Sequence, residues 1–161
     1  MKTASIHELK QQLTRVAPAQ LAELCIRLAK YKKENKELLT YLLFEAHDIQ
    51  AYIDAVKEEI DTAFAAMPDA NAYIVKKSLR KTLRLTNKHI KYTGSKQAEV
   101  ELLLHFCTTL KRSGIPVPKS TVLVNLWEQQ LKKITKAIST MHEDLQYDYE
   151  KAVTSLNIGF P

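Results

Sequence analysis

Glycine and proline are scarce in this sequence. Three glycines and five prolines in 161 residues fall below the averages of about 7% and about 5% in globular proteins. A fold of many short strands needs these residues in its turns, so their scarcity disfavours β-sandwiches and β-barrels. We predict an all-α fold over residues 1–161, either a single-domain bundle or a short HEAT-like stack of helix pairs, with about seven or eight helices.

Short catalytic and phosphate-binding motifs are also missing. The glycines Gly94, Gly114 and Gly159 cannot build GxxxxGK[ST] or GxGxxG, in which glycines let backbone amides approach a phosphate. Neither HExxH nor GxSxG occurs, and the five histidines are scattered along the chain. We therefore expect a non-enzymatic protein with no cofactor and no metal.

Cysteine and long apolar runs are scarce as well. Cys25 and Cys107 lie in apolar helical patterns without CxxC spacing, which favours buried, reduced thiols over a disulfide or a metal site. The first residues lack the apolar core of a signal peptide, and no run approaches the ~18 apolar residues of a membrane span. We expect a cytoplasmic protein that does not contact membranes.

Local signals predict the first four helices. The segment Ser5–Glu8 has the pattern of a capping box, and Pro18 suits the first turn of a second helix that ends near residues 31–33. The apolar run 35–46 predicts a core helix packed on two sides. Asp48 is a favourable cap for the fourth helix.

Glycine and serine divide the middle of the chain. A fifth helix is expected after Pro68 and Asp69, and Gly94 would end it in a left-handed conformation, with Ser95 capping the next helix. That sixth helix, 95–113, is apolar on both sides, and we predict that it is the buried centre of the fold. An extended link is expected at 114–118 because residues before proline avoid the α region.

The last third of the chain predicts one long helix. Apolar residues recur every three or four positions from Ser120 onward, consistent with roughly 25–30 helical residues. A break near 139–140 is the alternative. The segment 150–161 is expected to be a frayed or loosely docked tail.

Basic residues are concentrated in one segment. The net charge is +6, and residues 76–96 hold eight basic residues and no acid, so the rest of the chain carries −2. On a helix, five of them share one stripe, and its functional interpretation is contact with phosphates. The five candidates are Lys77, Lys81, Arg84, Lys88 and Lys91. The favoured interpretation is a solvated face that the acids of the preceding helix partly neutralise, namely Asp54, Glu58, Glu59 and Asp61. The basic helix precedes the Gly94 turn, unlike the recognition helix of a helix-turn-helix protein, which argues against reading of a DNA sequence.

Other candidate residues have ordinary structural interpretations. The group of His142, Glu143, Asp144, Asp148 and Glu150 could hold a metal or serve acid–base chemistry, but a solvated helix end is favoured. His105 lies among leucines, which is typical of a core histidine. Three aromatic residues are candidates for protein contacts if they are exposed. These are Trp127, Tyr147 and Tyr149.

Four stretches resemble a family of small, all-helical bacterial proteins of unknown function. They are RLAKYKKENKELLTYLLFE (27–45), KYTGSKQAEVELLLHFC (91–107), SGIPVPKSTVLVNLW (113–127) and HEDLQYDY (142–149). The resemblance covers most of the chain and implies a helical fold in a bacterial cytoplasm. It carries no catalytic or binding residues with it.

Three functional hypotheses follow from these patterns. The leading one is a helical interaction module that binds a protein partner or a second copy of itself, chiefly because catalytic motifs are missing. The alternative is nonspecific binding of nucleic acid through the basic helix around residues 76–96. An enzyme that uses the acid cluster at 142–148 is the third.

Overall fold

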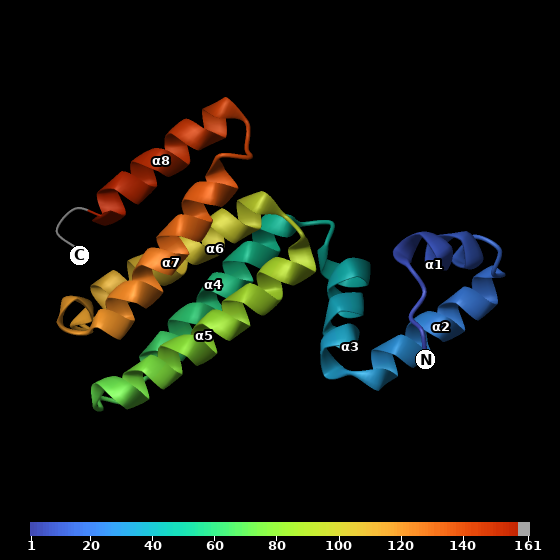
Figure 1. The fold of residues 1–161 in the computed structure, drawn as a ribbon, viewed down its shortest axis with the longest axis horizontal. Coiled ribbons are helices and arrows are strands. Elements are labelled where there is room, and N and C mark those ends of the chain that lie inside the picture. Colours follow the sequence, from blue (N-terminus) through green and yellow to red (C-terminus); the bar gives the residue numbers. More distant parts are fainter. Residues whose placement is uncertain (158–161) are drawn as a thin grey trace. The chain divides into compact units, whose positions relative to one another are not determined.

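The computed structural model describes residues 1–157, and most of this range is helical (Figure 1). That range holds eight α-helices, a π-helical turn and a 3₁₀ turn, and none of it is strand. The α-helices are α1 (Ile6–Leu13), α2 (Pro18–Tyr31), α3 (Lys33–Thr40), α4 (Ile49–Ala65), α5 (Ala72–Thr93), α6 (Lys96–Arg112), α7 (Thr121–Ile138) and α8 (Glu143–Asn157). The predicted all-α class and number of helices are confirmed. No described helix has the length and apolar character needed to cross a membrane.

Helix starts follow the local signals. Ser5 and Glu8 form the predicted capping box before α1, with the Ser5 amide donating to Glu8 Oε2 at 2.7 Å. Pro18 opens α2, and the Asp48 carboxylate accepts the Ala51 amide at 3.0 Å at the start of α4. These starts were predictable because each depends on residues three or four positions apart.

The chain divides into two compact units, residues 1–44 and the segment from Glu45 onward. A compact unit is defined by the contacts within it, whereas a domain is defined by independent folding. The expectation of a single domain therefore stays a prediction.

The first unit buries little apolar surface. Of residues 1–44, all of which are described, only Tyr41 is buried. The predicted core helix at 35–46 is wrong: α3 ends at Thr40, a π-helical turn follows, and Leu42, Leu43 and Phe44 are 55%, 64% and 68% exposed. A unit of this size has too little opposing surface to cover all its apolar side chains.

Helix α6 is the centre of the second unit. It packs against α4, α5, α7 and α8, all of which belong to that unit (Figure 1). Its buried residues lie on both sides of the helix and are Ala98, Val100, Leu102, Leu103, Phe106, Cys107 and Leu110. The predicted burial of this helix is confirmed, and each of its partner helices has an apolar surface on which to pack.

A glycine follows the end of α5 and another lies shortly after the end of α6. Gly94 has a φ of 59° and its amide donates to the Ile90 carbonyl at 3.1 Å, so α5 and α6 form the predicted tight hairpin. After Gly114 the expected extended link is wrong in part, because Val117–Lys119 form a 3₁₀ turn. Val117 is fully buried there, and this burial holds the turn against the core.

The long helix predicted after Ser120 is interrupted near residues 139–140, which was the alternative prediction. Helix α7 ends at Ile138, and the hydroxyls of Ser139 and Thr140 donate to the Lys136 and Ala137 carbonyls at 2.8 and 2.7 Å. Such bonds compete with helix continuation. Helix α8 then begins at Glu143.

The expected frayed tail is wrong as far as residue 157. Helix α8 includes residues 150–157, Leu156 is only 5% exposed, and Lys111 Nζ donates to the Leu156 carbonyl at 2.8 Å. The last part of that expectation, at 158–161, lies outside the described residues. The buried Leu156 side chain and the bond from the Lys111 ammonium to the Leu156 carbonyl hold the end of α8 in place.

Candidate nucleic-acid interface

Helix α5 has two opposite faces. Its buried residues, Leu79, Thr82, Leu83 and Thr86, point into the second unit. At 3.6 residues per turn, the five predicted cations lie within about 80° of one another around the axis, roughly opposite that buried face. We call these five residues, Lys77, Lys81, Arg84, Lys88 and Lys91, the basic stripe.

The basic stripe lies on the surface. Lys77, Lys81, Arg84 and Lys91 are exposed, and Lys88 is half-buried with its ammonium 5.9 Å from the centre of the Tyr92 ring. The first cation, Lys77, and the last, Lys91, are fourteen positions apart, which corresponds to about 21 Å along the axis. The stripe is therefore a straight row of positive charge on one helix.

Acids do not neutralise the exposed part of the stripe. Within residues 1–157, no carboxylate forms an ion pair with Lys77, Lys81, Arg84 or Lys91. This answers the question that the sequence left open. The positive potential of these four side chains is screened by solvent rather than cancelled by neighbouring charges.

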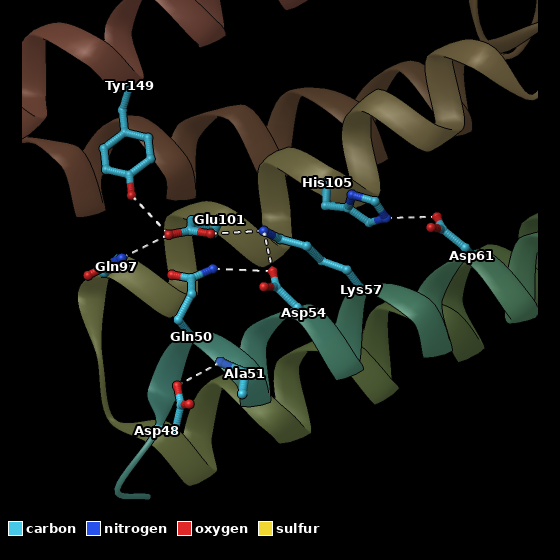
Figure 2. A network of polar contacts seen from close by, with 10 residues as sticks. All are labelled: Asp48, Gln50, Ala51, Asp54, Lys57, Asp61, Gln97, Glu101, His105 and Tyr149. Atoms are coloured by element: carbon cyan, nitrogen blue, oxygen red, sulfur yellow. Dashed lines mark hydrogen bonds and ion pairs between the residues drawn. The ribbon is translucent and has the colours of Figure 1, made fainter. Parts of the chain in front are cut away.

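The acids of α4 are engaged elsewhere (Figure 2). Asp54 accepts a bond from Lys57 at 3.3 Å, and Asp61 lies 2.7 Å from His105 Nε2 and also accepts the Thr109 hydroxyl at 3.2 Å. His105 and Thr109 belong to α6, so Asp61 faces that helix and not α5. The predicted neutralisation by Asp54 and Asp61 does not occur.

The other two acids of α4 do not pair with the four exposed cations of the stripe. Glu59 lies 3.6 Å from His89 Nε2, and the other ring nitrogen of His89 lies 2.6 Å from the Tyr52 hydroxyl. His89 is on α5, about 120° around the axis from Lys77. Glu58 is exposed and forms no ion pair with the stripe. Glu59 therefore tethers the side of α5 and does not cover its basic face.

A polar cluster joins α4, α6 and α8 (Figure 2). Glu101 accepts hydrogen bonds from Lys57 at 2.9 Å, Gln97 at 2.9 Å and Tyr149 at 3.2 Å. Lys57 and Glu101 side chains are 25% and 15% exposed. The sequence did not reveal this cluster, because 44 positions separate Lys57 from Glu101 and no short motif joins them.

The charges in this cluster perturb its acid–base equilibria. Burial raises the pKa of Glu101, but the bonds from Gln97 and Lys57 outweigh it, so this pKa is lowered overall. Burial and the nearby charge of Glu101 raise the pKa of Tyr149 to about 12. The cluster therefore holds a carboxylate, an ammonium and a neutral phenol at neutral pH, which is a stable hydrogen-bonded arrangement.

The remaining sequence candidates separate by exposure. Trp127 is fully buried, so it is not a surface contact residue, and Tyr149 is half-buried in the polar cluster. Tyr147 is 61% exposed. His142 and Asp144 form an exposed pair at 3.4 Å, consistent with a solvated helix end. Within residues 1–157, three or more potential metal ligands do not gather at any point.

Two surface residues beside the stripe were missed as site candidates. Arg80 is exposed and lies about 60° from Lys77 around the axis. Tyr73, which is 71% exposed, precedes Lys77 by four residues and so lies on the same face. Helical spacing could have identified both, because it depends on sequence positions alone.

Comparisons with known proteins add no constraint. No family model matches the chain, and neither the curated proteins nor the solved structures contain a match. The resemblance to small bacterial helical proteins stays a prediction.

Proposed function

We propose that the protein binds nucleic acid by its phosphate backbone, through the basic stripe of α5. One observation carries the proposal: within residues 1–157, Lys77, Lys81, Arg84 and Lys91 have no carboxylate partner. A row of exposed cations attracts the condensed counterion atmosphere of nucleic acid and releases ions on binding. A purely solvated face would more often be interspersed with acids along the same stripe.

Contacts with the phosphate backbone of a nucleic acid give affinity but do not distinguish one base sequence from another. Lysine and arginine reach phosphates from many orientations, and such contacts carry no sequence information. The buried face of α5 is packed into the second unit, and the helix that follows the turn, α6, is the core helix. This order differs from that of a helix-turn-helix reader, so we propose binding that is insensitive to sequence.

The test is fluorescence anisotropy with labelled oligonucleotides at 50 mM salt. The double variant Lys81→Glu with Arg84→Glu should abolish binding at micromolar protein, because it replaces two cations by two anions. A matched control is Lys132→Glu with Lys133→Glu, which makes the same charge change at exposed positions of α7. Absence of binding by the unaltered protein, or equal loss in both double variants, would contradict the proposal.

A second candidate function, binding of a protein partner, is supported by the first unit. A cleft of about 270 Å³ lies between α2 and α3, with an almost wholly apolar lining. It is lined by Cys25, Leu28, Ala29, Asn35, Leu38, Leu39 and Leu42. Asn35 Nδ2 donates to the Leu28 carbonyl at 2.8 Å, which fixes the corner between the two helices.

The occupant that fits this cleft is an amphipathic helix of a partner with acidic residues beside its apolar stripe. Residues 1–44 contain eight basic and four acidic residues, a net charge of +4, so acidic flanks would be attracted. Leu28→Asp with Leu39→Asp should abolish capture of such a partner. A strict monomer in light scattering, together with a pull-down that returns no specific protein, would contradict this candidate.

The proposal includes a cytoplasmic location. The two free thiols, Cys25 and Cys107, support it, because thiols persist in reducing compartments. Detection of the tagged protein in a periplasmic or secreted fraction would contradict it.

A further inference from the structure

The exposed face of α5 does not end with its cations. Tyr73 and Ile74, in the first turn of the helix, are 71% and 40% exposed. Tyr73 precedes Lys77 by four residues, so the two side chains are neighbours on one face, about 6 Å apart along the axis. A large aromatic ring therefore extends the basic stripe at its N-terminal end.

The Tyr73 ring is available for stacking. Within residues 1–157 it makes no hydrogen bond, ring contact or cation–π contact. Tyr92, near the other end of α5, differs: it is half-buried, and its ring lies 5.8 Å from His89 and 5.9 Å from the Lys88 ammonium. Tyr73 is thus the aromatic residue of this helix whose ring faces open solvent.

The helix also fixes the backbone position of Tyr73. Asn71 caps α5 by accepting the Ile74 amide at 3.2 Å, so Tyr73 lies within an ordered first turn. Tyrosine has few rotatable bonds, and its position on a capped helix lowers the entropy lost when it contacts a ligand. The backbone of Tyr73 is therefore ordered beside the cations before any ligand binds.

Cations in a row with an adjoining aromatic ring match the chemistry of single-stranded nucleic acid. The cations follow the phosphates, and the ring stacks on an unpaired base, whose flat surface is available whatever the sequence. A duplex offers the same phosphates but keeps its bases stacked on one another. A duplex would therefore leave Tyr73 without a contact of this kind.

We infer that the protein prefers single-stranded nucleic acid, with Tyr73 stacking on a base next to the phosphates that Lys77 and Lys81 contact. This inference rests on the proposed function of the basic stripe and adds the form of nucleic acid that is bound. An anionic membrane is the less suitable ligand, because Tyr73 and Ile74 are the only exposed large apolar residues of α5 and stable insertion needs a larger apolar face.

The experiment compares a labelled 12-nucleotide single strand with a duplex of the same length at 50 mM salt. We expect tighter binding to the single strand. Tyr73→Ala should weaken that binding on the order of 5-fold to 150-fold, the range for loss of one stacked base, and leave duplex binding unchanged. Tyr73→Trp should retain the preference. Tyr147→Ala is the matched control, because Tyr147 is also exposed but lies on α8.

The outcomes separate the inference from the proposed function. If Tyr73→Ala changes nothing while Lys81→Glu with Arg84→Glu abolishes binding, stacking is wrong and backbone binding stands. If the duplex is preferred, the inference is likewise overturned. If neither oligonucleotide binds, or if anionic phosphatidylserine vesicles bind and the single strand does not compete, the proposed function itself fails. Circular dichroism of each variant identifies any loss of folding.

Discussion

Lys57 on α4 donates to Glu101 on α6 at 2.9 Å, and this pair lies where α8 also approaches through Tyr149. Both side chains are largely withdrawn from solvent, so removal of one partner leaves the other poorly compensated. We expect Glu101→Ala to lower the free energy of unfolding by about 1–3 kcal/mol. Urea unfolding measures this, with Glu58→Ala, at an exposed position of α4, as the control. An unchanged midpoint for Glu101→Ala would show that the cluster adds no stability.

Glu101 should also make the unfolding free energy of the protein depend on pH in the acidic range. Its folded-state pKa is lowered from the usual 4.5, so the unfolded state binds the proton more readily than the folded state. The stabilisation is therefore present above about pH 4.5 and is lost as the pH falls through the lower folded-state pKa. Glu101→Gln should reduce the decline in unfolding free energy between pH 5 and about pH 3, whereas Glu58→Gln should keep it. Parallel declines in all three proteins would contradict this assignment.

Salt should weaken nucleic-acid binding with a slope set by the stripe. Four phosphate contacts, one for each of the exposed cations Lys77, Lys81, Arg84 and Lys91, predict a slope of log K against log salt near −2.8 for a single strand and near −3.6 for a duplex. Between 50 and 200 mM salt, affinity should fall on the order of 50-fold for a single strand and 150-fold for a duplex. The measurement is a titration at four salt concentrations. A slope near zero would mean that the cations do not contact phosphates.

Gly94 should be sensitive to substitution although it has space around it. Its φ of 59° is in the left-handed region, and an added methyl group would meet nothing within 4 Å. The cost of Gly94→Ala is therefore backbone strain rather than a clash, about 1 kcal/mol of unfolding free energy. Gly94→Asn should cost less, because asparagine adopts this conformation more readily. Equal stability of the alanine variant and the parent protein, in thermal unfolding, would contradict this reasoning.

The two thiols should differ in reactivity. Cys107 is fully buried and burial raises its pKa to about 12, whereas Cys25 is half-buried. A thiol reagent at pH 8 should therefore modify Cys25 in the native protein and reach Cys107 only after unfolding. Mass spectrometry of the modified peptides locates the label. Rapid labelling of Cys107 in the native state would show that α6 opens readily.

Features that depend on neighbouring positions were predictable from the sequence. The Ser5 capping box, the Gly94 turn and the common face of Lys77 and Lys91 each depend on helical spacing. Apolar residues on two sides of α6 likewise predicted its burial, because such a helix needs partners all round.

Features that depend on distant positions were not predictable. Asp61 was expected to face the stripe, yet it bonds to His105, 44 positions away. Whether Asp61 faces α5 or α6 depends on how α4 is rotated about its own axis. The packing of the buried residues Ile53 and Ile60 determines that rotation. In the first unit, the pattern identified Leu42 and Phe44 as apolar but could not tell whether an opposing surface exists to bury them.

The packing of α5 has a thermodynamic consequence for its cations. Leu79, Leu83 and Thr86 anchor the helix, and Gly94 ties its end to the core helix, so the spacing of the charges is set during folding and not during association. A disordered basic segment must become ordered on binding and loses part of its interaction energy in doing so. A row of charges on a folded helix avoids that loss, and its binding would be driven mainly by the entropy of the ions that leave the nucleic acid.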